Sequence, residues 1–199
     1  MNTARLETFA DGVFAIAATL LIIDVTADAR GGALGHAVLS AWPEYAAYGV
    51  SFVTIGIMWI NHHTMMDQIQ RADRRFLIAT IGLLMCIAFV PFPTRVVAEH
   101  IRGAGAQDAA LLYGFTLVVT AIMFNVNWLY ASRSRRLLRP DAGAAIVSGV
   151  TRSYLPGPYV YLGATLVAFA SPDASVILFM AIAFAYIVES SIFGAAEGH

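Results

Sequence analysis

The sequence contains no lysine, a single cysteine and few charged residues of any kind. Charged side chains make up 13% of its 199 residues and hydrophobic ones 59%, and the mean hydropathy is +0.70. A soluble domain of this size buries too little surface to hide so much apolar material. Because Cys86 has no second cysteine to pair with, a disulfide framework and a thiolate metal site within one chain are excluded. The net charge of -1, without a basic run that carries interleaved aromatics, excludes nucleic acid as a partner.

Long stretches with almost no charge alternate with short segments that hold most of the arginines, a pattern typical of helices that cross a bilayer. Each crossing needs about 20 mostly apolar residues. Apolar windows predict six transmembrane helices, at residues 5–26, 38–62, 75–99, 108–132, 154–171 and 174–193. We therefore expect an all-α integral membrane protein in which residues 1–199 form one six-helix domain. Pro172 should start the last helix, and Pro91 and Pro93 should kink the third.

The arginines predict the orientation of these helices in the membrane. If the N-terminus lies inside, nine arginines fall on the cytoplasmic side: Arg5, Arg71, Arg74, Arg75, Arg133, Arg135, Arg136, Arg139 and Arg152. Three fall outside or near it, namely Arg30, Arg95 and Arg102. This bias follows the positive-inside rule, and an odd number of helices would have destroyed it. We expect both termini in the cytoplasm of a multi-pass protein of the cell membrane.

The first predicted helix carries an apolar ridge and an ionisable residue. At 100° per residue, Ile16, Leu20 and Ile23 fall within about 60° of one another. Asp11 points away from that ridge. Because an unpaired carboxylate in lipid is costly, Asp11 should face protein and find a hydrogen-bond donor on a neighbouring helix.

Three segments resemble the transmembrane protein 175 family of potassium channels. The family's signature is an arginine, three residues, then Phe-Ser-Asp; here Arg5, Phe9 and Asp11 match, while Ala10 replaces the usual serine. Residues 58–63 (Met-Trp-Ile-Asn-His-His) and 91–94 (Pro-Phe-Pro-Thr) add to the likeness. The chain thus resembles a prokaryotic member of the family, whose subunits have six helices and lack the Thr-Val-Gly-Tyr-Gly selectivity loop.

The resemblance implies a homotetrameric channel that conducts potassium in preference to sodium, with the first helix lining the pore. Carried over by position, Ile16, Leu20 and Ile23 would form apolar constrictions, and Thr19 would add a hydroxyl near the narrow region. The composition is compatible with a pore on a symmetry axis, since no polar stripe wide enough for an internal channel is visible. No cofactor is expected besides the permeant potassium ion, and the preference for it should be modest.

The end of the second predicted helix gathers Trp59, Asn61, His62 and His63. Two metal ligands on one helical face are three or four residues apart, so the adjacent histidines do not predict a metal site. We expect one of them, with Asn61, to meet Asp11 or Arg5 and to tie the first helix to its support. The sequence leaves open which histidine takes part.

A different class of function stays open at this point. In a proton-coupled secondary transporter, Asp11, His62 and Glu189 would bind and release protons during alternating access. No nucleophile–base pair or metal constellation emerges, so an enzyme is not expected.

Overall fold

The protein is all-helical in the part of the chain that the structure describes. This computed structural model describes residues 3–23, 25, 38–39, 41–101, 103–133, 135 and 137–196, with backbone alone from 187 on. Its helices are α1 (Ala4–Ile23), α3 (Trp42–Asp67), α4 (Arg74–Phe89), α5 (Pro91–His100), α6 (Ala106–Ser132), α7 (Ala144–Tyr154), α8 (Gly157–Val167) and α9 (Pro172–Ala196). Within those ranges the all-α class is confirmed.

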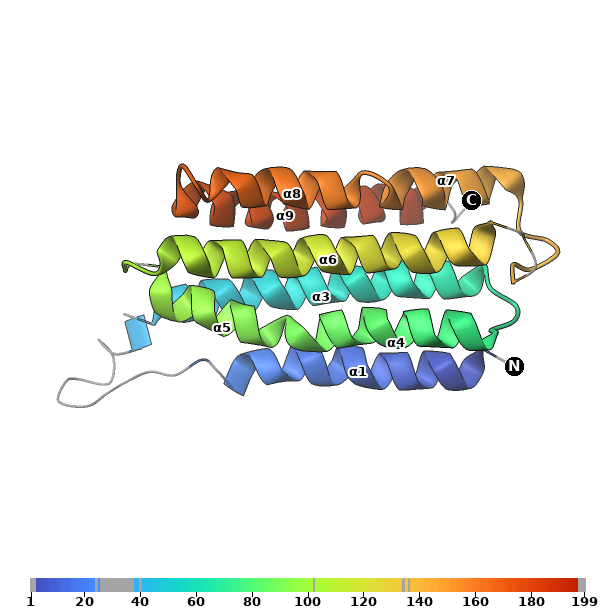
Figure 1. Cartoon of the computed structure of the whole chain (residues 1–199), viewed down its shortest axis with the longest axis horizontal. Helices are drawn as coiled ribbons and strands as arrows, with labels where there is room; N and C mark the ends of the chain where they lie inside the picture. The colour runs from blue at the N-terminus through green and yellow to red at the C-terminus, as the bar shows by residue number, and fades with distance from the viewer. Residues whose placement is uncertain are drawn as a thin grey trace.

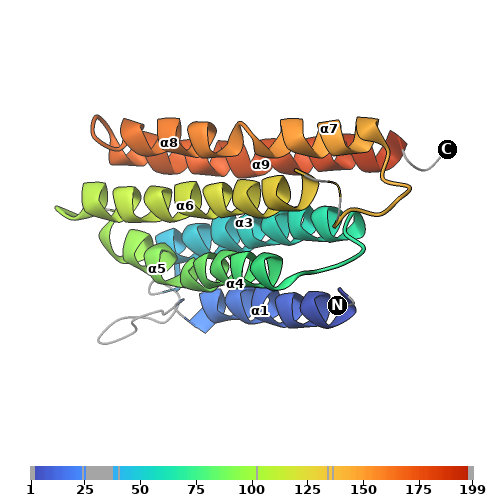
Figure 2. The same cartoon turned by 45° about the vertical axis from the view of Figure 1, so that its right-hand side comes forward.

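The helices form six roughly parallel rods, since α4 continues into α5 and α7 into α8 (Figures 1 and 2). α1 lies at one edge of the bundle, and the α7–α8 rod lies with α9 at the other. α6 lies between them and contacts α4, α5, α7, α8 and α9. The beginning of α1 and the end of α9 lie at the same end of the bundle, as an even number of passes requires.

Three of the described segments are long and apolar enough to cross a membrane by themselves: Ala4–Ile23, Arg74–His100 and Ala106–Ser132. A shorter apolar helix covers Pro172–Tyr186. The other rods carry more polar side chains or contain a break, so their apolar character is less continuous along the sequence.

Prolines and polar caps set several helix boundaries. The third predicted helix is interrupted at Val90, directly before Pro91, because proline lacks an amide donor and crowds the preceding turn. α9 begins at Pro172, as predicted, and Ser171 Oγ accepts a hydrogen bond from the Ala174 amide at 3.2 Å. α4 begins after Asp73, whose carboxylate accepts the Phe76 amide at 2.9 Å.

Two predicted boundaries differ from the structure by five residues or more. The second helix continues to Asp67 instead of ending at residue 62, so the histidine pair lies inside it. The fifth rod begins at Ala144, ten residues before the predicted start, and breaks after Tyr154. α7 escaped the hydropathy reading because it contains Arg152 and several small polar residues. Tyr154, at this break, is buried in the bundle.

Polar contacts join the helices at the end where α1 begins. The amide of Gln70 donates to the Leu137 carbonyl and that of Arg139 to the Gln68 carbonyl, each at 2.9 Å. The turn between α3 and α4 is therefore held against the segment after α6, and the two segments lie at one end of the bundle (Figure 1). Those segments and their flanking helix ends carry Arg71, Arg74, Arg75, Arg133, Arg135 and Arg139. Arg30, Arg102 and Arg136 lie outside the described residues.

Candidate functional site

α1 covers one of its faces with protein and leaves the other uncovered. It packs against α3, α4 and α5 through a buried stripe: Leu6, Ala10, Phe14, Ala17 and Leu21. The opposite side carries the ridge, where Ile16 is 61% exposed, Leu20 41% and Ile23 68%. Large aliphatic side chains so exposed on one helix need a covering outside the single subunit.

The same face carries small and polar groups beside the ridge. Thr19 is exposed, and its hydroxyl lies 2.9 Å from the Ala15 carbonyl and 3.0 Å from the Ile16 carbonyl, within its own helix. Because a hydroxyl oxygen keeps acceptor capacity while it donates, Thr19 still presents lone pairs outward. Nothing lies within 4 Å of where a side chain on Gly12 would begin. Arg5 and Phe9 are also exposed.

Asp11 meets a donor from α3, and that donor is a tryptophan. The Trp59 indole Nε1 donates to Asp11 Oδ1 at 2.9 Å. His63 stacks on the Trp59 ring, with centroids 5.8 Å apart, and its Nε2 lies 3.7 Å from the Asp67 carboxylate one turn further on. The structure therefore brings Asp11, Trp59 and His63 together at one place along α1 and α3.

No hydrogen bond joins His62 or Asn61 to Asp11 among the described residues. His62 is buried, with its ring 5.5 Å from that of Phe14 on α1 and with no hydrogen-bond partner for Nε2 among the described residues. The backbone carbonyl of Asn61 accepts a hydrogen bond from the Tyr154 hydroxyl. His62 thus supports α1 by packing, whereas Asn61 joins α3 to the α7–α8 rod. The side chain of Glu189 lies outside the described residues.

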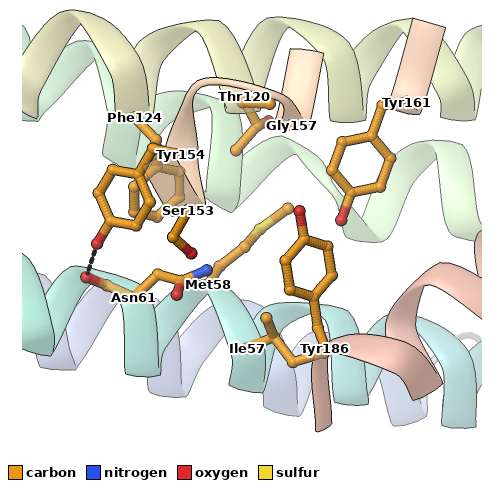
Figure 3. A pocket seen from close by; sticks show the side chains of 11 residues that line it. Ile57, Met58, Asn61, Thr120, Phe124, Ser153, Tyr154, Gly157, Tyr161 and Tyr186 are labelled. Carbon is orange, nitrogen blue, oxygen red and sulfur yellow. Dashed lines mark hydrogen bonds between the residues drawn. The ribbon is translucent and has the colours of Figure 1, made fainter. Parts of the chain in front are cut away.

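A small cavity lies behind this region, at the break between α7 and α8 (Figure 3). Its volume is about 50 Å³, and its mostly apolar wall includes the polar side chains of Asn61, Ser153, Tyr154, Tyr161 and Tyr186. It is large enough for a few waters. The sequence signal for the break is the pair Pro156 and Pro158, because each proline lacks an amide donor.

These features define a membrane protein whose edge helix leaves an apolar face for something outside the subunit. Comparison with known proteins agrees with that class. The profile of the family described as endosomal/lysosomal potassium channel TMEM175 matches residues 5–91.

Two bacterial relatives and one solved structure extend the match to most of the chain. A potassium channel of Streptomyces collinus is 45% identical over 150 residues, covering 72% of each chain. A potassium channel of Chamaesiphon minutus is 38% identical over 179 residues, covering 88% of each. The crystal structure of a lysosomal potassium-selective channel TMEM175 homolog from Chamaesiphon minutus superposes with a TM-score of 0.86 at 35% identity, covering 94% of this chain and 97% of the other.

The chain belongs to the TMEM175 family, as a prokaryotic member. The family consists of ion channels and not of enzymes.

Proposed function

We propose that the chain is the subunit of a homotetrameric potassium channel in the cell membrane, with α1 from each copy lining a central pore. Permeation is passive, potassium is modestly preferred over sodium, and no cofactor takes part. Both termini lie in the cytoplasm, because the arginine-rich turns share one end of the bundle with the start of α1 and the end of α9.

The uncovered face of α1 is the observation that carries this proposal. Its opposite face is fixed to α3 and α4 by a continuous buried stripe, so the orientation of Ile16, Leu20 and Ile23 is set by packing. In a closed ring of copies, one uncovered face per subunit can meet the same face of its neighbours around the axis. The exposed side chains of α1 would then line the axis.

Apolar rings on that axis would control the flow of ions. Four copies of Ile16, a branched side chain, would narrow the pore to a constriction that conducts or closes by wetting and dewetting. Leu20 and Ile23 would form further rings, about one and two turns away. The Thr19 hydroxyls would supply oxygen ligands between these rings.

The same arrangement limits selectivity. Side-chain rings of this kind offer no backbone carbonyl cage, and the sequence has no Thr-Val-Gly-Tyr-Gly loop to build one. Potassium sheds its hydration shell more easily than sodium, so an apolar constriction favours it moderately and not absolutely.

The contacts between α1 and α3 have a supporting role in this proposal. The Trp59–Asp11 hydrogen bond and the packing of His62 on Phe14 hold the cytoplasmic half of α1 at a fixed rotation. Arg5 and Phe9 continue the exposed face toward the cytoplasm. The relatives named as potassium channels, which cover most of this chain, support a channel over a proton-coupled carrier.

Recording from the purified protein in a planar bilayer tests the function. With a tenfold potassium gradient and sodium as the balancing cation, we expect unitary currents that reverse between zero and the potassium equilibrium potential. A carrier that uses Asp11, His62 and Glu189 would instead give saturable, proton-coupled uptake into liposomes without unitary events, and that result would overturn the proposal.

A further inference from the structure

A second cavity lies at the end of the bundle opposite to the beginning of α1, and no residue of α1 is among those that line it. It is lined by the first halves of α3 and α9 together with α5 and α6, and its volume is about 220 Å³. Ala47, Val50, Val97, Val176 and Phe179 are among the side chains that form its walls. An apolar protein cavity of about 150 Å³ is already large enough to bind benzene.

The polar groups on the floor of this cavity satisfy one another. Ser51 Oγ lies 2.8 Å from Thr94 Oγ1 and 3.1 Å from the Tyr113 hydroxyl. These three side chains come from α3, α5 and α6, and all are buried. Because these three side chains already hydrogen-bond to one another, a molecule in the cavity needs no polar group to satisfy them. A water molecule there would find few free hydrogen-bond partners.

The rim of the cavity identifies the kind of molecule that enters. Trp42 is 51% exposed at the start of α3, and tryptophan is typical of the level of the lipid headgroups. Ile177, 61% exposed, stands on α9 at the same rim. The cavity therefore lies just below headgroup level, at the depth of the acyl chains. A helix of a second copy, about 10 Å wide, is too broad to enter.

Among the described residues that line the cavity, the one charged side chain is Asp173, in the first turn of α9. Its exposed carboxylate repels an anionic headgroup and attracts the ammonium group of a zwitterionic one. Apolar walls and this carboxylate together are complementary to a lipid with an apolar tail and an ammonium-bearing head.

We propose that this cavity binds one acyl chain of a zwitterionic phospholipid, with the headgroup beside Trp42 and Asp173. A lipid held there would join α3, α5 and α9 at the outer end of each subunit. The site rests only on the chain being embedded in a bilayer, and it does not depend on α1 lining the pore.

Photolabelling of the whole reconstituted channel tests this site. The probe is a phosphatidylcholine with a diazirine on its acyl chain, present in trace amount in phosphatidylcholine liposomes, and the adducts are mapped by mass spectrometry. We expect adducts on Val50 and Val97, inside the cavity. Ala47→Phe fills the cavity and should reduce these adducts about tenfold, while adducts on the exposed Ile78 of α4 stay unchanged.

Ala88→Phe, at an exposed position on α4, is the matched control and should leave labelling of the cavity intact. If Ala47→Phe does not assemble, Ala46→Leu takes its place with less added bulk. Equal labelling of Val50 and Val97 with and without the filling side chain would overturn the site. So would wild-type protein labelled at Ile78 but not in the cavity.

A second labelling experiment tests the preference for a zwitterionic headgroup. A phosphatidylglycerol probe with the same chain should label the cavity about fivefold less than the phosphatidylcholine probe, and Asp173→Asn should remove that difference. Equal labelling by both probes in the wild-type channel would overturn the role of Asp173.

Discussion

Gly114→Ala should destabilise the subunit, because α6 and α8 touch at this glycine. A Cβ added there would lie 2.3 Å from Thr165 Oγ1 and 2.8 Å from both Thr165 Cγ2 and Phe179 Cζ. Such separations are far inside van der Waals contact, so one of the neighbours must move. Neither moves easily: Thr165 is fully buried with its hydroxyl bonded to the Tyr161 carbonyl at 2.7 Å, and Phe179 is buried on α9.

Overpacking of this kind costs about 1–3 kcal/mol. For a chain of about 200 residues this corresponds to a fall in Tm of roughly 2–12 °C, measured by thermal unfolding of the purified channel in one detergent. Gly163→Ala on α8 is the matched control, since no atom lies within 4 Å of its added Cβ. It should change stability by less than about 0.5 kcal/mol.

Thr165→Ala provides the decisive comparison, because it removes both threonine atoms that Gly114→Ala would strike. The double variant should therefore lose less stability than the sum of the losses in the two single variants. The difference, which is the coupling free energy, should be at least about 0.5 kcal/mol. The reasoning is refuted if Gly114→Ala unfolds at the wild-type temperature, or if the two substitutions are additive.

Four further substitutions test the pore helix, its hydrogen bond to α3 and the packing of α6 on α4. Ile16→Asn should raise unitary conductance or weaken potassium preference, because a polar ring wets the constriction. Ile78→Asn, at a similarly exposed site on α4, should change neither. Unchanged currents in the Ile16→Asn channel would count against the pore assignment. Asp11→Ala and Trp59→Phe each break the bond between α1 and α3, so size-exclusion chromatography should show fewer intact oligomers, while altered permeation in normal oligomers would contradict this structural role. Asn127→Ala removes the hydrogen bonds that a fully buried amide makes to α4 and to its own helix. It should lower the free energy of unfolding by about 1–2 kcal/mol, measured by thermal unfolding. An unchanged Tm would show that these hydrogen bonds contribute nothing to stability.

Hydropathy located most rods because each crossing must be apolar along its length, whatever its neighbours. It failed at α7, where Arg152 and small polar residues reduce the local hydropathy although the segment is a regular helix. The break at Val90 was predictable from Pro91, since the effect of proline is local. The break after Tyr154 was not predicted, because the fifth helix was expected to begin only at residue 154, so Pro156 and Pro158 fell at its start.

The candidate site was likewise predicted in part, where helical periodicity alone decides the outcome. Helical periodicity placed Ile16, Leu20 and Ile23 on one face and turned Asp11 away from it, and the structure has both features. It did not identify the donor for Asp11: we expected one of the histidines, with Asn61, to meet Asp11 or Arg5, and Trp59 donates instead. Trp59 and His62 are three residues apart on α3, so both lie on the side of that helix that faces α1. Only the packing of the two helices places the indole at the carboxylate and the imidazole against Phe14.

The most direct test of a pore lined by α1 is the accessibility of Ile16 from the ion pathway. In a Cys86→Ala background, which removes the single native cysteine, Ile16→Cys channels in a planar bilayer are exposed to a positively charged methanethiosulfonate reagent. We predict that the current through Ile16→Cys channels is blocked and the current through Ile78→Cys channels is not. Full modification of Ile16→Cys, verified by mass, with the current unaffected would contradict the account.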